Sequence, residues 1–181
     1  MRRIACVVLL AVLAGACGSS GHSAAPSLTL PITPRGQDTA RNMADAKKQF
    51  GALVKEDPKN KFGWYNLGVI AEYEHDTTAA AADDLEAIAI DPHFEAALYN
   101  YGVLQYGAAD YPAAITYLRR AVKEDARDAN ALWHLGIALG MRHTPAADRE
   151  ATRDLNAALK LDPTLVKTRT PASGSGGSGA A

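Results

Sequence analysis

The sequence predicts an all-α protein in which short helices pack side by side. Alanine, which favours helices more than any other residue, accounts for 36 of the 181 residues, whereas Phe, Trp and Tyr together account for only 12. A protein built from strands needs more aromatic and β-branched residues than this. The sequence also repeats with a period of 34 residues, as the segments WYNLG at 64–68, LYNYG at 98–102 and LWHLG at 132–136 show.

Residues 1–16 have the pattern of a secretory signal peptide. Arg2 and Arg3 precede an apolar run at 4–16, which is shorter than the roughly 20 residues needed to span a bilayer. We therefore expect an exported protein from which residues 1–16 are removed.

Cys17 follows the signal directly, within the segment LAGAC at 13–17. This segment resembles the lipobox of bacterial lipoproteins, and the resemblance implies that Cys17 carries a lipid, such as palmitate, which anchors the exported chain to the cell membrane. The other cysteine, Cys6, lies in the part that cleavage removes, so no internal disulfide is expected. The alternative is an ordinary cleavage after Ala16, which leaves Cys17 as a free thiol.

Two further segments are expected to lie outside the fold. Residues 17–36 are rich in Gly, Ser and Pro and should form a flexible linker. Residues 167–181 have too few apolar side chains to form a core and should be a disordered tail. Between them, residues 37–57 carry apolar side chains at helical spacing and should form an N-terminal packing helix or half-repeat.

The remaining chain divides into three units at 61–94, 95–128 and 129–166, the last with about three extra residues between 141 and 148. The units share glycine and alanine at fixed positions, the first unit adds Trp64 and Leu67, and the first and third units end in a proline. These positions are Trp64, Leu67, Gly68, Ala80, Ala87, Pro92, Gly102, Ala114, Ala121, Gly136, Ala151, Ala158 and Pro163. This pattern resembles the tetratricopeptide repeat (TPR), a pair of helices about 34 residues long. The resemblance implies a short right-handed superhelix, an α-solenoid of about seven helices.

A few residues differ from the repeat pattern, whereas others fit the packing of paired helices that the pattern implies. Ala71 and Leu139 replace a tyrosine, and Asp84 lies where the first unit should have an aromatic residue. Glycine inside a helix costs about 1 kcal/mol relative to alanine, so the three glycines of the pattern imply that a neighbouring helix approaches closely. Asp76, Asp110 and Thr144 are suited to cap the second helix of each unit.

The resemblance also implies a concave groove lined by the first helix of each unit. Three rows of residues should face this groove: Tyr65, Tyr99 and Trp133; Asn66, Asn100 and His134; and Val69, Val103 and Ile137. Asparagine amides can pair with an extended peptide backbone, and aromatic side chains are common binding anchors. The expected partner is an unidentified protein or peptide. The groove positions lack the Lys or Arg that would hold a peptide's terminal carboxylate.

Other classes of function are not expected. Nineteen Lys and Arg balance twenty Asp and Glu, so no nucleic-acid partner is expected. The five histidines show no metal-binding spacing, and neither a phosphate-binding loop nor a nucleophile elbow is present. We expect no enzyme, cofactor or metal, and interpret the charged segment 72–76 as a solvated turn. Two functions remain open: an envelope scaffold that binds a peptide or protein, and a structural or self-associating subunit.

Overall fold

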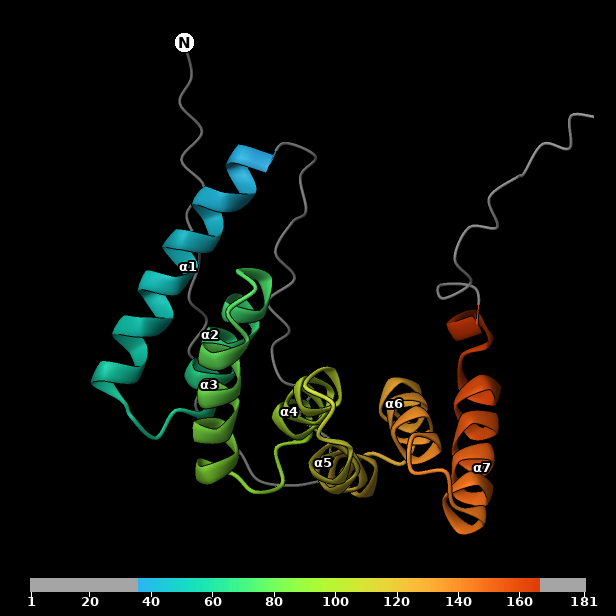
Figure 1. The fold of residues 1–181 in the computed structure, drawn as a ribbon. Coiled ribbons are helices and arrows are strands. Elements are labelled where there is room, and N and C mark those ends of the chain that lie inside the picture. The colour runs from blue at the N-terminus through green and yellow to red at the C-terminus, as the bar shows by residue number, and fades with distance from the viewer. Residues whose placement is uncertain (1–35, 167–181) are drawn as a thin grey trace, which may run out of the picture.

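The computed structural model describes residues 36–166, and within them the chain forms seven α-helices and one short 3-10 helix without strands (Figure 1). The α-helices are α1 (Gly36–Glu56), α2 (Lys61–Tyr73), α3 (Thr77–Ile90), α4 (Glu95–Gly107), α5 (Tyr111–Glu124), α6 (Ala129–Gly140) and α7 (Pro145–Leu161), and the 3-10 helix is η1 (Pro163–Val166). The predicted all-α class is therefore confirmed. The expected signal peptide, Cys17, the linker up to residue 35 and the C-terminal tail lie outside the described residues.

The helices form three hairpins that pack one after another. Turns of three or four residues join α2 to α3, α4 to α5 and α6 to α7, so the two helices of each pair run antiparallel. Each pair packs against the next through α3 with α4 and α5 with α6, and α1 packs against α2. Figure 1 shows this order from α1 to α7. Helix α4 also contacts α6, so the first helices of the second and third pairs are neighbours.

Side-chain caps begin the second helix of each pair, as the sequence predicts. The side chains of Asp76, Asp110 and Thr144 accept hydrogen bonds from the backbone N–H groups of Ala79, Ala113 and Ala147, at 3.0, 3.1 and 3.2 Å. Helices α1, α3 and α7 each end two residues before a proline, because the residue before proline avoids the helical conformation.

Small residues allow the paired helices to come close. The alanines of the repeat pattern are at most 5% exposed. A Cβ atom added to Gly136 would lie 3.1 Å from the backbone oxygen of Ala151, and one added to Gly102 would lie 3.2 Å from the backbone nitrogen of Leu118. The close approach expected from the three glycines is thus present.

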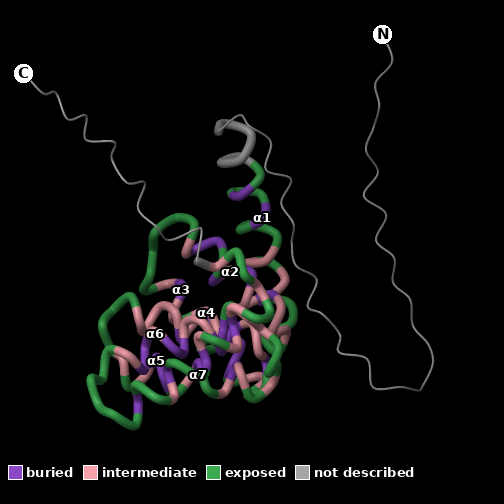
Figure 2. The backbone as a smooth tube through the Cα atoms, turned by 90° about the vertical axis from the view of Figure 1, so that its right-hand side faces the viewer, coloured by how far each residue is buried: buried purple, intermediate pink, exposed green. Residues whose placement is uncertain are grey.

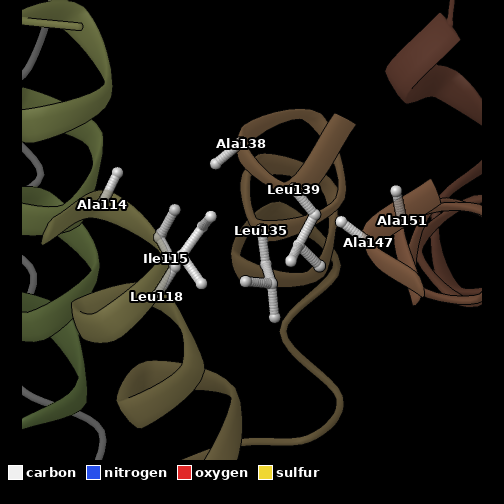
Figure 3. Close-up of a cluster of buried hydrophobic side chains, with 8 residues drawn as sticks. All are labelled: Ala114, Ile115, Leu118, Leu135, Ala138, Leu139, Ala147 and Ala151. Carbon is white, nitrogen blue, oxygen red and sulfur yellow. The ribbon is translucent and has the colours of Figure 1, made fainter. Parts of the chain in front are cut away.

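The core runs along the stack wherever the helices face one another, and the turns are exposed (Figure 2). One buried cluster joins three successive helices, α5, α6 and α7 (Figure 3). Its members are Ala114, Ile115, Leu118, Leu135, Ala138, Leu139, Ala147 and Ala151. Each pair therefore buries its apolar side chains against its neighbours, as a stack of repeats requires.

The extra residues of the third unit lie in a helix rather than in a loop. Helix α7 has 17 residues, whereas α3 and α5 have 14 each. Its alanines keep their repeat positions relative to Pro163, so the addition extends the N-terminal end of α7.

Candidate functional site

The nine predicted groove residues lie on α2, α4 and α6, and we call the surface that they mark the first-helix surface. Seven of the nine side chains are half-buried. The other two differ from them: Val69 is 36% exposed, whereas Asn66 is only 7% exposed.

Tyr65 connects α2 to α4. Its ring packs edge-on against Phe94, with centroids 5.3 Å apart. Burial raises the pKa of the Tyr65 hydroxyl, and the negative charges of Asp84, Glu72 and Glu95 raise it further, while a hydrogen bond with the Asn100 side chain opposes this rise. Tyr65 therefore lies among carboxyl groups, and Asn100 holds its hydroxyl.

Tyr99 connects α4 to α6 in the same way, through His134. The two rings meet edge-on at 5.5 Å, and the Tyr99 hydroxyl lies 3.2 Å from Nδ1 of His134. That Nδ1 is also 2.9 Å from the carbonyl oxygen of Asn130. Since a carbonyl only accepts, the proton belongs on Nδ1 of His134. The contact fixes the spacing of α4 and α6 at this surface.

The three side chains of the predicted amide row, Asn66, Asn100 and His134, have different surroundings in the structure. Asn66 donates from Nδ2 to the carbonyl oxygen of Phe62, one turn earlier in its own helix, at 2.7 Å. Asn100 lies near the Tyr65 hydroxyl and lowers its pKa, and His134, whose Nδ1 bonds to the Asn130 carbonyl, occupies the third position. Each of these side chains already has a partner within the protein. Peptide binding by these amides stays a prediction, and it requires the side chains to exchange partners.

The first-helix surface has a hollow at the C-terminal end of α2. Val69, Glu72, Tyr73 and His75 line this hollow, whose volume is about 650 Å³. Sequence reasoning found Val69 but missed Tyr73, which is 62% exposed. Helical spacing could have identified Tyr73 in the sequence. Glu72 and Tyr73 follow Val69 by three and four residues and therefore share its face of the helix.

The charged segment 72–76, interpreted as one solvated turn, has three separate roles in the structure. Glu74 forms an ion pair with Lys47 of α1 at 2.5 Å, Asp76 caps α3, and Glu72 lines the hollow. Across residues 36–166, no three His, Cys, Asp or Glu side chains are placed to hold a metal ion. In the same part of the chain, no helix is both long and apolar enough to cross a membrane.

Two charged groups lie where α2 and α4 begin. The ammonium group of Lys61 pairs with Asp91 and lies over the rings of Phe62 and Phe94, 5.1 and 4.9 Å from their centroids. The bond with Lys61 lowers the pKa of the Asp91 carboxyl. Glu95 behaves in the opposite way. Burial raises the pKa of its carboxyl to about 7, and two effects of Asp128 add to the rise: its negative charge and the hydrogen bond that it accepts from the protonated Glu95.

Solved structures of other proteins share this architecture. A crystal structure of MamA matches with a TM-score of 0.62 and 19% sequence identity, over 75% of this chain and 80% of that one. A crystal structure of YrrB, described as a TPR protein with an unusual peptide-binding site, matches with a TM-score of 0.62 and 18% identity, over 72% of this chain and 66% of that one. None of the curated proteins matches.

The repeat pattern itself is also matched. Residues 37–95 and 99–165 fit the model of the tetratricopeptide repeat family, and together they cover α1 and the three hairpins except for Gly36 and residues 96–98. The match begins within α1, and the interpretation of this helix as a packing helix or half-repeat stays a prediction. The chain belongs to the tetratricopeptide repeat family.

Proposed function

We propose that this protein is a non-enzymatic scaffold that binds a peptide or protein segment on its first-helix surface. The observation that carries this proposal is the row of half-buried Tyr65, Tyr99 and Trp133. The exposed Val69 lies one turn after Tyr65 on the same face of α2. Aromatic side chains provide a large contact area at low entropic cost. The description of YrrB as peptide-binding supports the same use of the fold.

A matched pair of variants tests this surface. Val69 on α2 and Leu85 on α3 are nearly equally exposed, at 36% and 38%, but only Val69 belongs to the first-helix surface. With a fluorescent peptide selected on the protein from a random library, Val69→Ser is expected to weaken binding about five- to tenfold through lost apolar contact. Leu85→Ser should leave the affinity unchanged. Equal affinities for the wild type and both variants, measured by fluorescence anisotropy, would contradict the proposed surface.

We also propose that the scaffold is tethered to the cell membrane through a lipid on Cys17 and faces the periplasm or the cell exterior. The support comes from the sequence of residues 1–17, where the apolar run and the small residues precede the cysteine. Two or more acyl chains hold a protein firmly at a membrane, and the resemblance to lipoproteins implies a diacylglyceryl group.

The tether can be tested in bacteria that produce the full chain. Detergent-phase partitioning should place the wild type in the detergent phase and Cys17→Ser in the aqueous phase, because the variant has no thiol to acylate. Mass spectrometry of the wild-type N-terminal peptide should show the added lipid. A wild-type protein in the aqueous phase with a free Cys17 thiol would instead support ordinary cleavage after Ala16.

A further inference from the structure

The hollow at the end of α2 combines apolar walls with a carboxyl group. Val69 and Tyr73 expose apolar surface there, at 36% and 62%. Glu72 is half-buried, and burial raises the pKa of its carboxyl. Among the described residues, no ion pair involves Glu72.

A second carboxyl lies behind the first. Asp84 of α3 is fully buried, and neither of its carboxylate oxygens has a hydrogen-bond partner. Its Oδ1 packs against Gly68, 3.1 Å from where a Cβ would be. Glu72 follows Gly68 by four residues, so both lie on the α2 face that Asp84 contacts. The negative charge of Glu72 is one of the causes that raise the pKa of Asp84. The charge of Glu72 therefore acts on Asp84, and no ion pair of the described residues involves either carboxyl.

Positive charge is scarce along the whole first-helix surface. Helices α2, α4 and α6 contain a single Lys or Arg, namely Lys61, and it is paired with Asp91. The same helices contribute Glu72 and Glu95, and the Oε1 atom of Glu95 is buried without a partner. The other cations of the described residues lie on α1, α5, α7 and the turns. A surface of this kind attracts and orients a positively charged partner.

We propose that the hollow receives a lysine or arginine side chain from the protein segment bound on the first-helix surface, an assignment that rests on the function proposed above. The alkyl part of that side chain packs on Val69 and Tyr73, since long cationic side chains bury their stems on apolar surface. Its charged group reaches the Glu72 carboxylate and lies near the Tyr73 ring, which adds a cation–π contact. An arginine can form two parallel hydrogen bonds with the carboxylate.

The test begins with selection from a random peptide library on the folded protein, followed by calorimetry with the selected peptides. We expect Arg or Lys at one fixed position of the selected sequences. Replacing that arginine by citrulline, which is nearly isosteric and uncharged, should weaken binding to the wild type about tenfold. Glu72→Gln should bind both peptides equally. Glu74→Gln is the matched control, because Glu74 pairs with Lys47, and it should keep the preference for arginine.

The possible outcomes separate the two proposals. If no peptide is enriched, both the peptide-binding function and the assignment of the hollow fail. If the selected peptides bind but show no basic position, or if Glu72→Gln still prefers arginine over citrulline, only the assignment of the hollow fails. Tyr73→Ala gives a second measure should Glu72→Gln not fold. Because the Tyr73 side chain is 62% exposed, its removal should spare the fold and weaken the arginine peptide more than an unrelated surface change does.

Discussion

Replacing Asp84 by leucine is expected to raise the free energy of unfolding by several kcal/mol at pH 8. Asp84 is fully buried and neither carboxylate oxygen has a partner. The equivalent positions of the other two units hold Leu118 and Leu155, which face Gly102 and Gly136 as Asp84 faces Gly68. Leucine at position 84 thus restores the packing of the other repeats and removes a carboxyl that costs energy whenever it is ionised.

The same substitution is expected to change the pH dependence of stability. Burial, followed by the charges of Glu72 and Asp83, raises the pKa of Asp84 from 3.8 to about 8. Between pH 4 and pH 8 the unfolded chain loses this proton while the folded chain keeps it, so stability falls as pH rises and levels off above pH 8. At about 1.4 kcal/mol per pH unit, the loss over this range is of the order of 5 kcal/mol.

Urea unfolding at a series of pH values measures this effect. Glu95, with its pKa raised to about 7, contributes a slope of the same sign, so the informative quantity is the difference between the variant and the wild type. Asp84→Asn is the control, since an amide of the same shape never ionises. Asp84→Asn should change the pH dependence of the free energy of unfolding as much as Asp84→Leu does, but it should stabilise the protein less than Asp84→Leu. If Asp84→Leu kept the wild-type slope, the pKa of Asp84 would have to be the same in the folded and the unfolded protein, and burial would not raise it.

The helices and their ends were predictable because their signals are local. The caps at Asp76, Asp110 and Thr144 depend on residues within three positions of each helix start. The burial of the repeat alanines follows from a period that the sequence displays directly. The three extra residues could be counted but not placed, because their position depends on where α7 begins.

The candidate site was less predictable because it depends on what lies opposite each side chain. Asn66 has the correct repeat position for the groove, yet its amide bonds to a carbonyl of its own helix. This bond depends on the rotamer of the side chain, which the sequence pattern does not reveal. Glu72 was interpreted as part of a solvated turn because charged residues usually are exposed. Its half-burial beside Val69 and Tyr73 arises from the hollow itself. The sequence shows that Asp84 differs from the repeat pattern. That its carboxylate has no hydrogen-bond partner, however, follows only from how the helices pack.

The last prediction concerns Gly136, where α6 packs against α7. Gly136→Ala is expected to lower the free energy of unfolding by about 1–2 kcal/mol, although alanine is the better helix former by about 1 kcal/mol. A Cβ at this position would lie 2.6 Å from Cγ of Leu155 and 3.1 Å from the backbone oxygen of Ala151. Overpacking of this kind typically costs 1–3 kcal/mol before the gain in propensity, and the displaced atoms belong to α7, which forms the last pair of the stack.

Two comparisons show whether the contact with α7 causes this loss. Gly51→Ala in α1 is the matched control, because no atom lies within 4 Å of its added Cβ, and it should stabilise the protein by about 0.5–1 kcal/mol. The second comparison is a double-mutant cycle with Leu155→Ala. Shortening Leu155 makes room for the new Cβ, so Gly136→Ala should cost less in the Leu155→Ala background than in the wild type. Urea unfolding of the four proteins gives this coupling energy. A coupling of zero would mean that the Leu155 side chain does not cause the loss, whereas no loss of stability in Gly136→Ala itself would mean that the approach of the two helices does not require glycine at this position.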